Sequence, residues 1–430
     1  MKTNKTITAL ALLLLVALAW TRPAGARVYL DITAAEIRKV PMAVPYFIDK
    51  GKADKASAAG IKMADTLSRG LTFHGFIDVT PPDLYQGRQD ADWQALGVDF
   101  TVLGQYTLND DEIVLEMRLI NLTEGRMLLG RRYRGPINKH GEMTLKFCDE
   151  VILTLTGENG ISRSQIAFVS DLSGNKEIYL ADALGDNIRQ LTHHKNLAVS
   201  PRFSPDGQYL AYTSYHHGNA DLYLTNLTQG LTTRPISRRK GLNMAPAWTP
   251  DGKSMVVTLS KDGTPDLYQI DTKGAILRRL TANAGINVSP SWSPDGSRLA
   301  FVSDRTGRPQ VYVMDMKSKN VRRITYDGDD NTSPSWSPKG DLIAYTGKHE
   351  GNYSIFLISP EGGNSTRVTT GWGNHETPSW SPDGNQLVYV RERQGTKKAC
   401  TVFKNGKGMR ELFSLKGNQT FPQWSPRPPK

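Results

Sequence analysis

The histidines and acidic residues of this chain would bind a metal or catalyse proton transfer only if their spacing brought them together. A zinc-binding helix needs a second histidine four residues after the first, and neither His349-Glu350 nor His375-Glu376 has one. His193-His194 and His216-His217 are adjacent pairs, and on an extended backbone the rings of each pair point apart. The chain also contains no G-x-S-x-G nucleophile motif. We therefore expect no metal, no cofactor and no catalytic residue, with these histidines exposed in loops.

Four aspartates recur at regular intervals along the chain because they belong to a repeated sequence motif. The sequence SPSWSPDG at 289–296 returns with small changes, and the first prolines of its copies fall at 201, 246, 290, 334, 378 and 422. A repeat of this length with four strands per unit is typical of propeller blades. Ser-Pro-Asp-Gly is a type I turn sequence, so each aspartate belongs to a turn on a separate blade. They form no close pair: Asp206, Asp251, Asp295 and Asp383.

The aromatic residue of each copy is predicted to lie on the innermost strand of its blade. It follows the first proline by two positions, and proline cannot donate a hydrogen bond to a sheet, so this strand must lie at an edge. We interpret the aromatic side chain as packing between neighbouring blades. Strands resembling LAYxS, IYxxD and RxLT complete each unit. The aromatic residues are Phe203, Trp248, Trp292, Trp336, Trp380 and Trp424.

The repeats begin and end out of phase, which predicts how the ring closes. The first unit, from Ser164, lacks its innermost strand, and the clipped last copy at 421–425 has no strand after it. Together these two segments make one complete blade, so the open sheet edge disappears. The predicted fold is an α/β N-terminal domain at 27–157, followed by an all-β, six-bladed β-propeller at 158–430.

The N-terminal domain shows no repeat and reads as alternating helices and strands. Apolar residues at helical spacing predict helices at 54–70, where Gly70 would end the helix, and at 143–155. A further short helix is predicted at 91–96. Strands are predicted at 42–47, 76–79, 100–108, 113–122 and 127–134, the last two as a hairpin.

The first 26 residues have the features of a secretory signal peptide. Lys2 and Lys5 precede an apolar run at 7–20, and Ala24-Gly25-Ala26 predicts cleavage after Ala26. No other apolar run approaches the length of a membrane-spanning helix. We expect an exported, soluble mature protein that begins at Arg27.

Charge and cysteine content argue against a nucleic-acid-binding protein and against a disulfide-linked scaffold. The formal net charge is +11, but the basic residues are dispersed, and pairs such as Arg278-Arg279 recur at one repeat position. We interpret them as a solvated outer strand and expect no nucleic-acid partner. An oxidising compartment would permit a disulfide between Cys148 and Cys400. We expect two buried free thiols instead, because they lie in different predicted domains.

Three stretches carry a resemblance to a known family: ALGVDFTVLGQ at 95–105, CDEVILTLTG at 148–157 and SDRTGRPQVYVMD at 303–315. With the signal peptide, the α/β domain and the six repeats, the chain resembles the TolB family, periplasmic components of the Tol-Pal system. The resemblance implies a monomeric binding protein, not an enzyme. It implies docking of the lipoprotein Pal on the propeller, which makes the protein peripheral to the outer membrane. It also implies binding of TolA by the N-terminal region, with roles in outer-membrane integrity and division. The alternative is a periplasmic hydrolase or lyase acting in the axial channel.

The predicted binding residues lie in loops and at the N-terminus. One propeller face carries the similar Ser-Pro-Asp-Gly turns, so we expect partners on the opposite face, around the channel mouth. The resemblance places the Pal site at Leu242, Asn243, Ala245, Asn287 and Val288. The corresponding loops of other blades add Asn331, Thr332, His375 and Glu376.

The mature N-terminus, RVYLDIT at 27–33, is amphipathic in an extended conformation. Val28, Leu30 and Ile32 alternate with Tyr29 and Asp31 after Arg27. One interpretation is an edge strand of the α/β domain. The other, implied by the resemblance, is a detachable arm that pairs with TolA by strand addition, or otherwise packs between the two domains.

Overall fold

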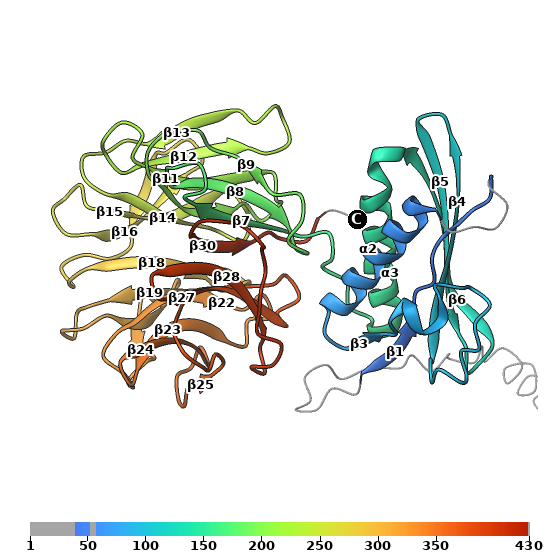
Figure 1. The fold of residues 1–430 in the computed structure, drawn as a ribbon. Coiled ribbons are helices and arrows are strands. Elements are labelled where there is room, and N and C mark those ends of the chain that lie inside the picture. The colour runs from blue at the N-terminus through green and yellow to red at the C-terminus, as the bar shows by residue number, and fades with distance from the viewer. Residues whose placement is uncertain (1–38, 52–56, 429–430) are drawn as a thin grey trace, which may run out of the picture.

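The computed structural model describes residues 39–51 and 57–428, and it shows an α/β domain beside a β-propeller (Figure 1). The signal peptide, Ala26 and the arm 27–33 lie outside the described residues. The α/β domain has a sheet in the order β3-β1-β4-β5-β6, with β2 paired to β4. Its two helices lie between this sheet and the propeller (Figure 1). The elements are β1 (Val40–Ala43), β2 (Ile48–Asp49), α2 (Ala58–Phe73), β3 (Ile77–Val79), η1 (Pro82–Tyr85), β4 (Phe100–Asn109), β5 (Glu112–Asn121), β6 (Arg126–Pro136), η2 (Ile137–Lys139) and α3 (His140–Thr156).

Helix α2 begins at a side-chain cap and continues past the predicted stop. The Ser57 hydroxyl accepts a hydrogen bond from the Gly60 backbone N–H at 3.2 Å, which caps the first turn. Gly70 does not end the helix, which runs on to Phe73. A Cβ on Gly70 would lie 3.0 Å from Cys148 Sγ, so the glycine is present because α2 and α3 approach each other closely there.

Two other local predictions in this domain were wrong. Residues 91–96 form turns, not a helix, in which the Asp92 carboxylate accepts a hydrogen bond from the Ala95 backbone N–H. The strand predicted at 42–47 begins at Val40 and ends at Ala43. Beyond it the backbone leaves the sheet, because Phe47 N–H donates to the Gly60 carbonyl.

The propeller consists of six four-stranded antiparallel sheets, so the predicted fold class is confirmed. The inner strands are β10 (Ala198–Phe203), β14 (Asn243–Trp248), β18 (Asn287–Trp292), β22 (Asn331–Trp336), β26 (Asn374–Trp380) and β30 (Gln419–Trp424). The second strands are β7 (Gln165–Ser170), β11 (Tyr209–Ser214), β15 (Ser254–Leu259), β19 (Arg298–Ser303), β23 (Ile343–His349) and β27 (Gln386–Arg393). The third strands are β8 (Glu177–Asp182), β12 (Asp221–Asn226), β16 (Asp266–Asp271), β20 (Gln310–Asp315), β24 (Asn352–Ile358) and β28 (Thr396–Phe403). The outer strands are β9 (Arg189–Gln190), β13 (Thr233–Ser237), β17 (Ile276–Arg279), β21 (Val321–Arg323), β25 (Thr366–Arg367) and β29 (Arg410–Glu411).

The ring closes as predicted, with the C-terminal strand β30 completing the first blade in the order β30-β7-β8-β9. In this pairing Trp424 lies opposite Ile166 and Gln419 opposite Ser170. Segments from the two ends of the propeller sequence therefore share one sheet (Figure 1).

Each inner strand carries a bulge at its first proline, which sequence reasoning did not anticipate. In β18 the pairing register shifts between Val288 and Ser291, and Ser289, just before the proline, has φ of +53°. Proline disfavours the right-handed helical region for the residue before it and donates no hydrogen bond, so the ladder is interrupted at this point. The corresponding residues with positive φ are Ser200, Ala245, Ser333, Thr377 and Phe421.

The α/β domain packs on the propeller face that carries the Ser-Pro-Asp-Gly turns, called here the SPDG face. Gln386 Nε2 donates to the Phe73 carbonyl at 3.0 Å, and Lys339 pairs with Glu158 of the linker at 3.3 Å. Arg69 of α2 pairs with Asp186, in the loop between the third and outer strands of the first blade. The opposite face, called here the open face, carries the loops before each inner strand and between the second and third strands.

The two cysteines are buried free thiols, as expected. Burial raises the pKa of both the Cys148 and Cys400 thiols, which keeps them protonated and unreactive. Within residues 39–51 and 57–428, no helix is long and apolar enough to cross a membrane.

Candidate protein-binding site

The predicted Pal-site asparagines are buried at the junctions between blades. Asn243 has no exposed surface, and its Nδ2 donates to the Ala220 and Arg239 carbonyls at 2.9 and 2.7 Å. Its Oδ1 accepts from the Ser237 hydroxyl at 2.5 Å. An amide with both ends satisfied by the preceding blade holds a loop in place and is not available to a partner. The prediction that the Asn243 side chain contacts Pal directly is therefore corrected: this side chain holds the loop in position.

Asn287 has the same role in the next blade. It is fully buried, its Nδ2 donates to Asp266 Oδ1 at 3.0 Å, and its Oδ1 accepts from Arg305 Nη2 at 3.0 Å. Asn331 is 1% exposed and donates to Gln310 Oε1 at 2.9 Å. Asn287 and Asn331 thus each tie an inner strand to the third strand of the preceding blade. For these two side chains as well, the predicted direct contact with Pal is replaced by a role in positioning the loops.

The remaining predicted mouth residues divide by exposure. His375 is 1% exposed and packs against the Tyr389 ring, and burial lowers its imidazole pKa to about 4. Its side chain is therefore neutral and inaccessible. The prediction that His375 is exposed in a loop was wrong, because this residue lies on β26. Glu376 is half-buried at the mouth, where loss of hydration raises its carboxyl pKa. The others keep partial exposure and stay available for contact: Leu242, Ala245, Val288 and Thr332.

The open face also carries exposed large apolar side chains that sequence reasoning missed. Tyr326 is 68% exposed, Trp372 is 60% exposed and Ile286 is 43% exposed, and all three lie in loops that lead into inner strands. Leu172, between β7 and β8, is 45% exposed. Arg393 lies 5.7 Å from the Trp372 ring and donates from Nε to the Trp372 carbonyl, which fixes this residue. Exposed aromatic residues on a rigid scaffold are typical of protein-binding surfaces.

The histidine pairs lie on the same face, and one prediction about them was wrong. His216 and His217 have ring centroids 4.5 Å apart, because they occupy a tight turn in place of extended backbone. His194 is half-buried, with Nδ1 2.6 Å from the Ser214 hydroxyl and its ring 5.3 Å from that of Tyr223. Burial lowers the pKa of the His194 imidazole. Nowhere in the described segments of the chain do three His, Cys, Asp or Glu side chains form a group that could hold a metal ion.

The axial channel has a volume of about 470 Å³ and is lined by the six inner strands. Among the residues that the structure describes, its lining consists of Ser, Thr, Pro, Ala, Gln and aromatic residues, with Arg202 as the single charged residue. The turn aspartates are hydrogen-bonded within their own turns. Asp295, for example, accepts a hydrogen bond from the Ser293 hydroxyl at 2.6 Å. Within residues 39–51 and 57–428, no carboxylate or imidazole lines the channel.

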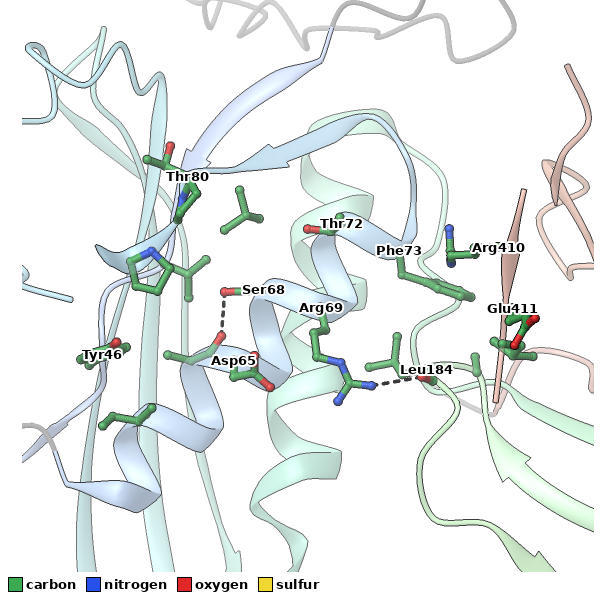
Figure 2. Close-up of a pocket in the computed structure, with 18 residues that line it drawn as sticks. Tyr46, Asp65, Ser68, Arg69, Thr72, Phe73, Thr80, Leu184, Arg410 and Glu411 are labelled. Atoms are coloured by element: carbon green, nitrogen blue, oxygen red, sulfur yellow. Dashed lines mark hydrogen bonds between the residues drawn. The ribbon is translucent and has the colours of Figure 1, made fainter. Parts of the chain in front are cut away.

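A second cavity, of about 640 Å³, lies between the α/β domain and the propeller (Figure 2). Its α2 side presents Asp65, Ser68, Arg69 and Thr72, and its propeller side includes Leu184, Arg410 and Glu411. Arg69 Nη2 donates to the Leu184 carbonyl at 3.1 Å and so ties the two walls together (Figure 2). The remaining lining residues are mostly apolar: Val44, Tyr46, Ile61, Ala64, Phe73, Val79, Thr80, Pro81, Pro82, Ala183 and Leu412.

The fold and its faces define a two-domain scaffold, in which an α/β domain partly covers one face of a closed six-bladed β-propeller. A model of the TolB amino-terminal domain matches residues 28–128, and a model of the TolB beta propeller domain matches residues 153–428. The chain belongs to the TolB family.

Individual relatives agree with this family. The chain is 46% identical over 213 residues to a Tol-Pal system protein TolB of Desulfotalea psychrophila, covering 50% of this chain and 49% of that protein. It is 39% identical over 190 residues to a TolB homolog of Chlorobaculum tepidum, covering 41% and 44%. The matched region spans about half the length of these curated relatives. The crystal structure of TolB from Acinetobacter baumannii has a TM-score of 0.79 at 27% identity, and the match covers 91% of this chain and 97% of that one.

Proposed function

We propose that this chain is a periplasmic protein-binding scaffold of the Tol-Pal system and not an enzyme. In this proposal the open face docks a Pal-type peptidoglycan-associated lipoprotein, and the mature N-terminus at 27–33 binds TolA. A signal peptide cleaved after Ala26 exports the chain, which acts as a monomer held peripherally at the outer membrane through Pal. Its role is in outer-membrane integrity and constriction at division.

The observation that carries the Pal proposal is the exposed apolar set on the open face. Ile286, Tyr326 and Trp372 project from loops that buried amides such as Asn287 hold in place. Preorganised apolar and aromatic side chains lose little conformational entropy on binding, which favours affinity. The SPDG face is partly occupied by the α/β domain, which leaves the open face as the larger accessible surface of the ring. Membership of the TolB family supports a Pal-type lipoprotein as the partner.

The test of this proposal is a titration of the purified mature chain with the periplasmic domain of a Pal-type lipoprotein. We expect saturable one-to-one binding, and no turnover of peptide, ester or glycoside substrates by the chain alone. Absence of binding would contradict the Pal assignment. Turnover that is lost on mutation of a channel-lining serine would instead favour the hydrolase or lyase alternative.

The interdomain cavity supports the proposal that the N-terminal arm has a docked state. The six residues 34–39 join the arm to β1, and a chain of six residues spans at most about 20 Å when fully extended. The apolar side of the arm, formed by Val28, Leu30 and Ile32, suits the apolar lining of the cavity. In this proposal the docked arm is withheld from TolA and the released arm pairs with it by strand addition. Binding of TolA and docking in the cavity are then mutually exclusive.

Deletion of residues 27–33 from the mature chain should abolish TolA binding and leave Pal binding intact. Filling the cavity gives the opposite expectation. Thr72→Trp places a large side chain at an exposed cavity position, which should release the arm and strengthen TolA binding. Lys62→Trp is the control, because Lys62 is exposed on the same helix outside the cavity lining. Unchanged TolA affinity in Thr72→Trp would contradict arm docking at this cavity.

A further inference from the structure

One charged side chain interrupts an otherwise neutral axial channel. In each copy of the repeat, the residue after the first proline lies on the inner strand and lines the channel. Five copies place a small or neutral polar residue there, and the first inner strand, β10, places Arg202. The five counterparts of Arg202 are Ala247, Ser291, Ser335, Ser379 and Gln423.

The Arg202 guanidinium has few partners within the protein. Nη1 donates to the carbonyl of Pro201 at 2.9 Å, and no carboxylate in residues 39–51 and 57–428 pairs with it. Burial within the ring lowers the pKa of this guanidinium to about 10, so it stays positively charged at neutral pH. A guanidinium carries five N–H donors, so one backbone carbonyl leaves most of them available to a ligand in the channel. Arg202 keeps partial exposure to the channel, and a partly buried charge without a counter-ion is favourable only where a ligand of opposite charge or water solvates it.

Two serine hydroxyls of the channel lining accept hydrogen bonds from neighbouring inner strands. Ser291 Oγ accepts a hydrogen bond from the Trp336 backbone N–H at 3.0 Å. Ser379 Oγ accepts from the Trp424 backbone N–H at 3.1 Å and from Gln423 Nε2 at 2.9 Å. Each hydroxyl also carries one O–H donor, which can serve a ligand in the channel. No acidic side chain from the described part of the chain lines the channel to compete for these donors.

We propose that the axial channel binds a small oxyanion, such as inorganic phosphate, at Arg202. The guanidinium supplies the charge and a planar pair of donors suited to two oxygens, and the serine hydroxyls supply further donors. A metal cation would meet a positive charge and no carboxylate, so the lining disfavours it. The site lies inside the ring and needs no residue of the proposed Pal or TolA surfaces. It is therefore independent of the proposed function.

The variant Arg202→Ser tests this site directly. It installs the serine that three other blades carry at this position, so the fold is expected to persist, as circular dichroism would verify. Arg278→Ser is the matched control, because Arg278 is exposed on the outer strand β17. Phosphate binding to the whole mature chain is measured by equilibrium dialysis and by the melting temperature, against sodium chloride at equal ionic strength.

The expected result is saturable binding of one phosphate per chain by the wild type and by Arg278→Ser. Arg202→Ser should bind at least tenfold more weakly and lose the phosphate-dependent rise in melting temperature, since a ligand stabilises only the state that binds it. Arg202→Lys should fall between them, because it keeps the charge and loses the planar fork.

Equal phosphate affinity in the wild type and Arg202→Ser would overturn the proposal, as would the absence of saturable binding by the wild type. A third outcome would also overturn it. If phosphate has no effect but Arg202→Ser weakens capture of the Pal domain, the charge serves a carboxylate of a docked protein and not a free oxyanion.

Discussion

The Phe73 ring at the end of α2 lies 6.0 Å from the Trp424 ring on β30, the strand that closes the propeller. Trp424 is 3% exposed, and its Nε1 donates to the Ser164 hydroxyl at 2.7 Å, at the start of the first blade. One indole therefore contacts the closing strand's own blade and the α/β domain together. Ring closure and domain packing share this residue, so a change at Trp424 should affect both.

Replacement of Trp424 by alanine should destabilise the whole chain. Truncation of a buried aromatic residue costs about 3–5 kcal/mol, comparable with the total stability of many domains. Removal of residue 421 onward should be more severe, because it also exposes two sheet edges. Trp372→Ala is the control, since Trp372 is 60% exposed. Thermal unfolding should show a large fall in melting temperature for Trp424→Ala and little change for Trp372→Ala; equal melting of the two would contradict the closure described here.

His74 makes the junction between the domains sensitive to pH. Its Nδ1–H donates to the Gly70 carbonyl at 2.9 Å, and its Nε2 accepts from the Ile161 N–H of the linker at 3.2 Å. Burial lowers the imidazole pKa, and the nearby carboxylates of Asp149 and Asp383 oppose this shift only partly. Protonation would remove the acceptor that the linker N–H requires.

The direction of the pH effect follows from this lowered pKa. The unfolded chain protonates His74 near pH 6.5 while the folded chain does not, so stability is present above that pH and falls as pH drops below it. His74→Gln keeps one donor and one acceptor without ionising, so it should flatten the profile by up to about 2 kcal/mol at pH 5. Denaturant unfolding at pH 7.5 and pH 5 would measure this difference, with His217→Gln, on an exposed turn, as the control. Identical profiles for His74→Gln and the wild type would refute this assignment.

Two helical glycines should respond oppositely to alanine. At Gly70 a new Cβ would lie 3.0 Å from Cys148 Sγ and 3.1 Å from Leu145 Cδ2, so Gly70→Ala should destabilise by about 1–3 kcal/mol. At Gly141, in α3, nothing lies within 4 Å, so Gly141→Ala should be neutral or stabilise by up to about 1 kcal/mol through helix propensity. Chemical denaturation of both variants checks the contrast. A stabilised Gly70→Ala would show that α2 and α3 are not closely packed there.

Much of the fold could be predicted from the sequence, because each blade repeats its own signals. The proline positions predict six blades, and the missing inner strand of the first unit predicts the closure that β30 and β7 form. The errors fall where local signals compete with tertiary packing. Gly70 reads as a helix stop, yet it is present because α3 approaches closely, a contact that no local pattern encodes.

The candidate site was less predictable, because exposure depends on how each loop packs against the neighbouring blade. Asn243 and Asn287 read as polar loop residues, but both are buried and hydrogen-bonded to residues distant in sequence. Charged substitutions at these positions should therefore destabilise the junction between blades as well as alter docking. Trp372 and Ile286 had a usable signal, since each is a large apolar residue in a variable loop near an inner strand. The signal for Arg202 was clearer, because the other five repeats have an uncharged residue at the equivalent position.

Docking on the open face is tested by the affinity of the mature chain for the periplasmic domain of a Pal-type lipoprotein, with and without the open-face apolar residues. Isothermal titration would compare the wild type, the double variant Ile286→Ala/Trp372→Ala, and the control Leu277→Ala, whose side chain is 55% exposed on the outer strand β17. We expect the double variant to bind at least tenfold more weakly, about 1.4 kcal/mol, while Leu277→Ala binds as the wild type does and all three melt alike. Undiminished binding by the double variant, with the fold intact, would contradict docking on the open face.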